Sequence, residues 1–137
     1  MKKQLMSNKS WGINLSMLLL RITLGLTMIY LHGLPKLNTL FSGTQIKFAN
    51  PFGLGAMASL SLVVFAEVIC SVLLVLGLLT RLSLLPLIFT MGVAVFIIHG
   101  GEGLRSQESA IIYLVGYLVL FLQGSGKYSL DRLLLRK

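Results

Sequence analysis

The run from Gly55 to Leu79 limits most strongly what this chain can fold into, because it is uncharged apart from one carboxylate, Glu67. A helix needs about 20 apolar residues to cross the hydrocarbon core of a bilayer, and this run is long enough. A charge at the centre of such a span costs about 2.5–3.5 kcal/mol and is tolerated only with a partner, a proton or water. Glu67 is therefore the first candidate for a functional residue inside a membrane.

The composition of the whole chain supports the same environment. It is 55% hydrophobic and 12% charged, whereas soluble domains carry about 25% charge. The net charge of +8 would suggest nucleic acid in a soluble domain. Here the basic residues flank apolar runs, where anionic lipid headgroups are the expected counter-charge. We therefore expect a protein that is embedded in a lipid bilayer and binds no nucleic acid.

Four apolar runs predict an all-α membrane protein, with four transmembrane helices in one antiparallel bundle that forms a single domain over residues 1–137. The expected spans cover residues 13–31, 55–79, 82–98 and 109–123. Pro35 is expected to end the first span, and Pro86 to lie in the first turn of the third. The fourth span is short, so Glu108 is expected to open it near the interface.

The segments outside the spans have their own patterns. The connection at residues 33–54 is too polar to cross a membrane and contains Phe41, Phe48 and Phe52. It predicts an aromatic outer loop over the mouth of the bundle. The C-terminal residues predict a short interfacial helix that begins near Ser129.

Basic residues are distributed unevenly between the two expected ends of the bundle. One end has eight, namely Lys2, Lys3, Lys9, Arg81, Lys127, Arg132, Arg136 and Lys137. The other has three, namely Lys36, Lys47 and Arg105. The positive-inside rule then predicts a multi-pass protein of the bacterial plasma membrane with both termini in the cytoplasm.

Arg21 is the second charged residue inside an apolar run. Arg21 and His32 are close to three helical turns apart, so both project from one helix face. We expect this face to point into the bundle, although an arginine near the end of a span can also extend to headgroups. The expected depths of Arg21 and Glu67 predict an ion pair or a shared water between them.

A polar cluster is expected at the outer end of the bundle, where His32, His99 and Glu108 end or begin three different spans. Such side chains can bind a polar ligand group or carry a proton. Hydrogen bonding of the histidines to helix-end carbonyls is the simpler interpretation, and a haem or a metal site that includes Glu102 is a weaker one. No metal is assigned. The single cysteine, Cys70, supports neither a disulfide nor an iron–sulfur site.

Several short motifs occur together in a characteristic order. They are Arg21 and Gly25; His32-Gly33 with Lys36-Leu37; Glu67; Gly77-Leu78-Leu79-Thr80-Arg81; Met91, Ala94 and His99; and Gly124-x-Gly126-x-x-Ser129-Leu130-Asp131. In this order, the chain resembles the DoxX family of small four-helix bacterial membrane proteins. The resemblance implies a plasma-membrane location, and some relatives are subunits of a thiosulfate:quinone oxidoreductase or are linked to quinone and catechol stress.

Three functions remain open at this point. The first is a membrane subunit that handles quinone or a similar redox carrier, assisted by a partner redox subunit because the chain has no flavin, nucleotide or iron–sulfur motif. The second is a structural or assembly subunit of a membrane complex. The third is a small transporter or proton pathway, which would require a homo-oligomer. Whether the chain is an enzyme stays open, and the candidates for ligand or proton handling are Arg21, His32, Lys36, Glu67, His99 and Glu108.

Overall fold

The computed structural model describes residue 7 and residues 12–135. In that part of the chain all regular structure is helical. Four helices are long and apolar enough to cross a membrane: Ile13–Leu40, Ala56–Leu76, Thr80–Ile98 and Leu104–Gln123. The predicted all-α fold with four transmembrane-length helices is confirmed.

Each of the first three spans contains a π-helical stretch, labelled η. The first span consists of α2 (Ile13–Met28), η1 (Ile29–Gly33) and α3 (Leu34–Leu40). The second consists of α4 (Ala56–Val64), η2 (Phe65–Cys70) and α5 (Ser71–Leu76), and the third of α6 (Thr80–Val93) and η3 (Ala94–Ile98). The fourth span is α7 (Leu104–Gln123), and the short helix α8 (Leu130–Leu134) follows it.

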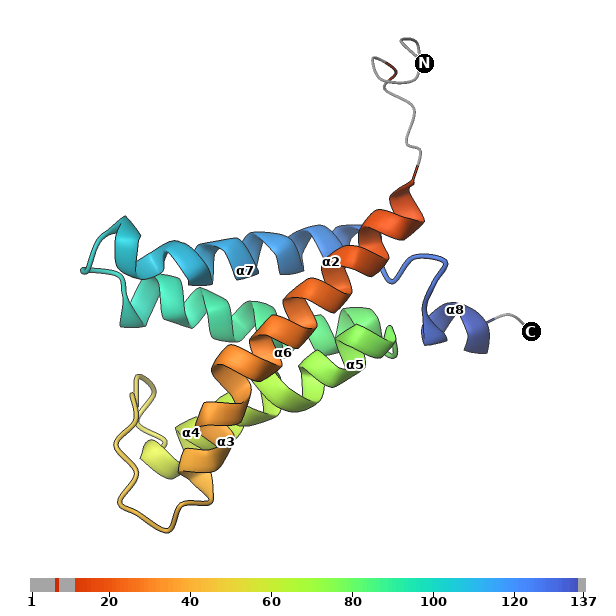
Figure 1. Cartoon of the computed structure of the whole chain (residues 1–137). Helices are drawn as coiled ribbons and strands as arrows, with labels where there is room; N and C mark the ends of the chain where they lie inside the picture. Colours follow the sequence, from red (N-terminus) through yellow and green to blue (C-terminus); the bar gives the residue numbers. More distant parts are fainter. Residues whose placement is uncertain (1–6, 8–11, 136–137) are drawn as a thin grey trace.

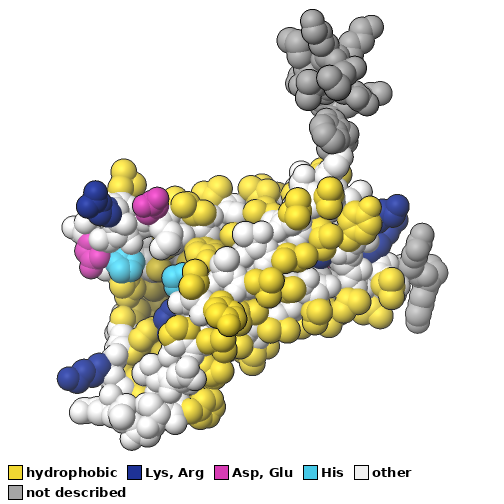
Figure 2. All heavy atoms as spheres, viewed as in Figure 1, with side chains coloured by type: hydrophobic (Ala, Val, Ile, Leu, Met, Phe, Trp, Pro, Cys, Tyr) yellow, Lys and Arg dark blue, Asp and Glu magenta, His cyan; other side chains and the backbone are white. Residues whose placement is uncertain are grey.

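The helices pack in two main pairs, with α6 along α7 and α2 across α5 (Figure 1). Their buried faces form one core, whose fully buried apolar side chains include Met28, Leu74, Leu84, Leu87, Tyr117 and Leu120. The outer faces of the same helices are also apolar, with side chains such as Leu19, Phe89 and Leu122 largely exposed. Figure 2 shows hydrophobic side chains along the length of the bundle. An outer surface of this kind is typical of helices surrounded by lipid.

Glycines allow the first and second spans to approach closely. A Cβ added to Gly25 would overlap Cγ2 of Val75 and lie 3.1 Å from the carbonyl oxygen of Ser71. A Cβ added to Gly33 would lie 3.1 Å from the carbonyl oxygen of Glu67. Small residues at such contacts are characteristic of helix pairs in membranes. The contact at Gly33 also places η1 directly beside η2, which contains Glu67.

The first span is longer than predicted, because the helix continues through Pro35 to Leu40. Pro35 lies at the start of α3, immediately after η1. A proline lacks the N–H for a regular helical hydrogen bond, and its ring clashes with an earlier carbonyl. The wider π-turn before Pro35 relieves that clash, so the helix does not end. The prediction that Pro35 marks the exit was therefore wrong, and Lys36 lies within the span.

The third and fourth spans also begin earlier than predicted. Thr80 begins α6, so Pro86 lies in the second turn and not in the first. Leu104 begins α7, which makes this span full length and places Glu108 in its second turn. The amide of Gln107 donates to the carbonyl oxygens of Val95 and His99, at 3.0 and 3.1 Å. This contact joins the first turn of α7 to the end of the third span.

The C-terminal segment is attached to the start of α6. The predicted start of α8 at Ser129 is confirmed, since its hydroxyl accepts the N–H of Arg132 at 3.2 Å. The carboxylate of Asp131 accepts the N–H groups of Leu79 and Thr80, at 2.7 and 2.9 Å. Partial burial opposes ionisation of Asp131, but the hydrogen bonds from Thr80 and Leu79 outweigh it and hold the pKa of this carboxyl below its usual value.

Asp131→Asn is expected to destabilise the protein by about 1 kcal/mol at pH 7, a typical cost for a lost helix cap. The pKa of the Asp131 carboxyl is lower in the folded protein than in the unfolded chain, where it is about 4. The stabilisation by Asp131 is therefore complete above the unfolded pKa and is lost as the pH falls through the folded pKa. Thermal unfolding of parent and variant in detergent between pH 7 and pH 3 measures this. The exposed residue Glu108 supplies the control, Glu108→Gln. A difference between Asp131→Asn and parent that does not shrink in acid would contradict the assignment.

Candidate functional site

A cavity of about 500 Å³ lies between the second and third spans, at the end of the bundle that holds loop 41–55. We call it the lateral cavity, and Figure 2 shows the molecule hollowed at this end. Its lining includes Leu62, Phe65 and Glu67 from the second span, Phe89, Thr90, Ala94 and His99 from the third span and its end, and Phe48, Pro51 and Phe52 from the loop. Most of these side chains are apolar, and few are charged.

The lateral cavity opens toward the surrounding lipid. Leu62 and Phe89, which line it, are 58% and 63% exposed on the apolar outer surface of the spans. Phe52 of the loop stacks on Phe89, with ring centroids 6.0 Å apart and planes 25° apart. The loop therefore covers the cavity from the end of the bundle.

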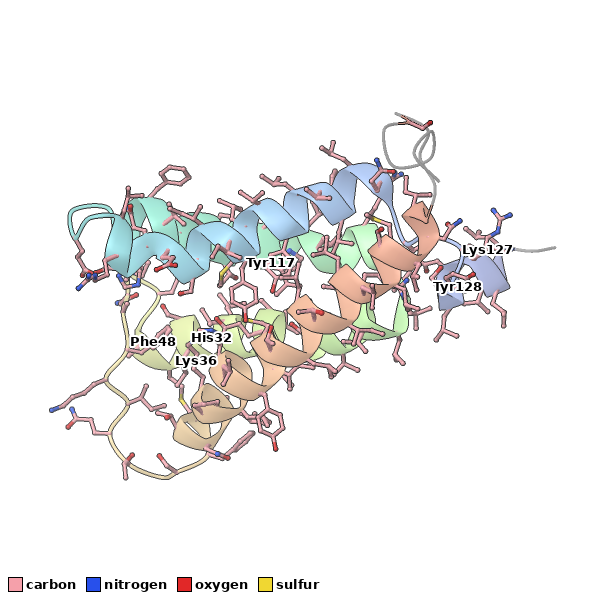
Figure 3. The ribbon with its side chains drawn as sticks, turned by 45° about the horizontal axis from the view of Figure 1, so that its top comes forward. His32, Lys36, Phe48, Tyr117, Lys127 and Tyr128 are labelled. Atoms are coloured by element: carbon pink, nitrogen blue, oxygen red, sulfur yellow. The ribbon has the colours of Figure 1, made fainter. Side chains whose placement is uncertain are left out.

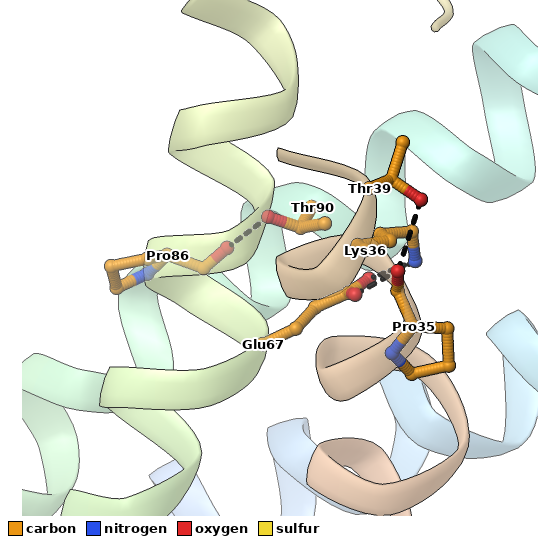
Figure 4. Close-up of polar contacts among 6 residues, drawn as sticks. All are labelled: Pro35, Lys36, Thr39, Glu67, Pro86 and Thr90. Atoms are coloured by element: carbon orange, nitrogen blue, oxygen red, sulfur yellow. Dashed lines mark hydrogen bonds and ion pairs between the residues drawn. The ribbon is translucent and has the colours of Figure 1, made fainter. Parts of the chain in front are cut away.

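An ion pair lies in the wall of this cavity. The ammonium of Lys36 donates to both carboxylate oxygens of Glu67, at 2.7 and 3.0 Å (Figure 4). The side chain of Glu67 is 3% exposed and that of Lys36 is 28% exposed. Lys36 reaches Glu67 because α3 continues the first span past Pro35 and because Gly33 brings η1 against η2.

Arg21 does not contact Glu67, so the predicted pair between them was wrong. Arg21 does lie inside the bundle, as expected, and is 1% exposed. Its Nη1 donates to the carbonyl oxygen of Ser125 at 2.6 Å, and its Nη2 to that of Tyr128 at 2.7 Å. The arginine side chain thus extends toward the C-terminal segment, at the end of the bundle opposite Lys36. Figure 3 shows Lys36 and Tyr128 at these two ends.

The three π-helices of the described residues belong to the same region. His32 lies in η1 and Glu67 in η2, while Ala94 of η3 lines the lateral cavity. A π-turn is rare, is less favourable than an α-turn, and is frequently found at functional sites. It also rotates the side chains that follow it relative to those before it. Residues of η2 and η3 line the lateral cavity, and η1 packs directly against η2.

The two histidines and Glu108 do not form one cluster. His99 lines the cavity, and its Nδ1 lies 2.7 Å from Oε2 of Glu102. The ring of His32 packs edge-on against Tyr113, with centroids 5.5 Å apart, and is not part of the cavity lining. Glu108 is exposed and also lies outside the lining. Of the six candidates, Lys36, Glu67 and His99 line the lateral cavity.

Two polar lining residues were absent from the predicted set. Thr90 lines the cavity, and its hydroxyl donates to the carbonyl oxygen of Pro86 at 2.8 Å (Figure 4). Ser59 reaches Oδ1 of Asn50 in the loop at 3.3 Å. Isolated serines and threonines in apolar runs carry no distinctive signal in one sequence. In residue 7 and residues 12–135, no three His, Cys, Asp or Glu side chains are grouped to hold a metal ion.

These features define a small multi-pass helical membrane protein with a largely apolar cavity beside a partly buried ion pair. A model of the DoxX family matches residues 16–100. An uncharacterized protein from Haemophilus influenzae is 35% identical over 130 residues, covering 90% of this chain and 85% of that protein. No solved structure matches the chain. The chain therefore belongs to the DoxX family, as its motifs indicated.

Proposed function

We propose that this protein is a membrane subunit that binds a quinone, or a similar lipid-soluble redox carrier, in the lateral cavity. The observation that supports this is a largely apolar cavity, open toward lipid, with the Lys36–Glu67 pair in its wall. A quinone ring needs an apolar slot, and its carbonyl oxygens need hydrogen-bond donors. Lys36 and His99 supply donors, and Glu67 is a group that can hold a proton beside them.

The size and lining of the cavity fit such a ligand. Its volume of about 500 Å³ lies within the range of about 300–1,000 Å³ for small-molecule sites. Phe52 and Phe89 offer ring faces at its opening. The sequence has no flavin, nucleotide or iron–sulfur motif of its own, so electron transfer to the carrier would come from a partner redox subunit.

The proposal includes an orientation in the bacterial plasma membrane, with both termini in the cytoplasm. Its support is the uneven distribution of basic residues; five of these, Lys2, Lys3, Lys9, Arg136 and Lys137, lie outside the described residues. Lys47→Cys and Lys127→Cys, each in a Cys70→Ala background, test it. A membrane-impermeant thiol reagent on intact cells should label position 47 and not position 127. The opposite labelling would invert the orientation.

Filling the cavity tests the binding itself. Ala94 lines the cavity, so Ala94→Phe is expected to weaken binding of a short-chain quinone by about tenfold or more through steric exclusion. Val115 lies on the exposed outer face of α7, and Val115→Phe adds the same ring there as a matched control. Binding is measured by titration of purified protein in lipid nanodiscs, with thermal unfolding of each variant as a check of the fold.

Equal binding by Ala94→Phe and the parent would show that the lateral cavity is not the quinone site. If neither binds the quinone, the protein is better described as a structural or assembly subunit. Proton flux through the parent in liposomes, abolished by Glu67→Gln, would instead favour the transport function. These three results are mutually distinct, so the experiments separate the three classes of function.

A further inference from the structure

A second hollow, of about 660 Å³, lies at the opposite end of the bundle from the lateral cavity. We call it the basic hollow, because its lining includes the cations Arg81, Lys127 and Arg132. They come from the first turn of α6, from the segment after α7 and from α8. The first turn of α6 and the C-terminal segment, which are distant from each other in sequence, thus place positive charge around one space. Figure 3 shows Lys127 at this end of the molecule.

The positive charge of the basic hollow is only partly neutralised by the described part of the chain, because three cations share the lining with one carboxylate, Asp131. Asp131 also lines the hollow, but both of its carboxylate oxygens accept backbone N–H groups, from Leu79 and Thr80. The ion pairs among the described residues, Lys36–Glu67 and His99–Glu102, belong to the other end of the bundle. The side chains of Lys127 and Arg132 are therefore available to an external anion.

The basic hollow lies where the third span begins and the fourth span ends. Arg81 is the second residue of the third span, and Gln123, the last residue of the fourth, also lines the hollow. The apolar side chains of Leu79, Leu82 and Leu135 line it as well, and all three are largely exposed. A ligand here would contact cations on one side and lipid-facing leucines on the other.

We propose that the basic hollow binds the headgroup of an anionic phospholipid, with the phosphate near Lys127 and Arg132 and the acyl chains along Leu82. A phosphate matches the cluster of cations, and Arg can hold it through two parallel hydrogen bonds. A soluble anion would make no use of the exposed leucines, whereas a lipid is anchored by them. This binding site is separate from the lateral cavity and does not depend on the function proposed there.

Titration of purified protein in neutral detergent with phosphatidylglycerol or phosphatidylcholine tests the proposal, with bound lipid counted by native mass spectrometry. The parent should retain phosphatidylglycerol in preference to phosphatidylcholine. Lys127→Ala with Arg132→Ala should weaken phosphatidylglycerol binding by about 25-fold, at roughly fivefold for each cation near the surface. Neither side chain contacts another described side chain through a hydrogen bond or ion pair, so the fold should persist.

Lys47→Ala with Arg105→Ala is the matched control, because it removes the same number of cations from the other end of the bundle and should leave binding unchanged. An equal loss of phosphatidylglycerol binding in both double variants would mean that the lipid is attracted by the overall charge and not by this site. Equal retention of phosphatidylglycerol and phosphatidylcholine by the parent would mean that the headgroup is not recognised. Either result overturns the proposal. Inorganic phosphate is the third probe. If it raises the thermal unfolding midpoint of the parent as much as phosphatidylglycerol does, the site binds a soluble anion and the lipid proposal is wrong. The comparison of lipids and of phosphate uses the parent alone, so it holds even if the variant does not fold.

Discussion

Lys36→Met is expected to lower the free energy of unfolding by about 3–5 kcal/mol, the usual cost when one partner of a buried ion pair is removed. The loss is large because Glu67 is 3% exposed and takes both of its hydrogen bonds from Lys36. Glu67→Gln should cost less, because the remaining ammonium is 28% exposed and can turn toward the mouth of the cavity. Reversible unfolding in mixed detergent micelles measures both variants.

The double variant, Lys36→Met with Glu67→Leu, is expected to be more stable than the sum of the losses measured for Lys36→Met alone and Glu67→Leu alone, since it leaves no unpaired charge. Lys47→Met provides the control, because Lys47 is exposed in the loop and pairs with no described residue. It should change stability by less than about 0.5 kcal/mol. If the loss of stability in the double variant equals the sum of the losses in Lys36→Met and Glu67→Leu, the contact between the two side chains contributes nothing to the stability of the fold. A stable double variant that no longer binds quinone would separate the ligand-binding role of the pair from its structural role.

Arg21→Met is expected to have a comparable effect, also about 3–5 kcal/mol, through a different part of the molecule. It removes two charge-assisted hydrogen bonds to the carbonyl oxygens of Ser125 and Tyr128, each worth about 1.5–3 kcal/mol. Both carbonyls belong to the segment that leads from α7 to α8. We therefore expect this segment to detach from the bundle, and limited proteolysis after residue 123 to accelerate together with the loss of thermal stability.

Arg21→Lys separates charge from geometry at the same position. A single ammonium is more compact than the planar fork of an arginine, so it is expected to retain part of the stability but not both carbonyl contacts. Arg105→Met is the matched control in an exposed part of α7. Gly77 supports this arrangement, because a Cβ there would lie 2.5 Å from Nη1 of Arg21. Unchanged proteolysis in Arg21→Met would show that other contacts, such as those of Asp131, hold the C-terminal segment alone.

The pattern of apolar residues was sufficient to predict the class of fold. The four spans follow from local composition, since a run of apolar residues must leave water wherever it lies in the sequence. The start of α8 at Ser129 could also be predicted locally, because a helix cap depends only on the capping residue and the few residues that follow it. The burial of Glu67 and Arg21 followed from their positions within apolar runs. The identity of their partners did not.

The partners of Glu67 and Arg21 depend on how each helix is rotated about its axis and on how far it extends. Neither property can be predicted from the residues of one segment alone. Pro35 would normally end a helix, yet the π-turn before it lets the first span continue and carries Lys36 to Glu67. The residues that hold Arg21 are separated from it by more than a hundred positions. Polar residues at the start of α7 resemble a loop in sequence, yet they are helical, and Gln107 among them donates to carbonyl oxygens of the third span. The sequence by itself determined which segments enter the membrane and which charges must find partners there, whereas close packing of the spans decided which partners they found.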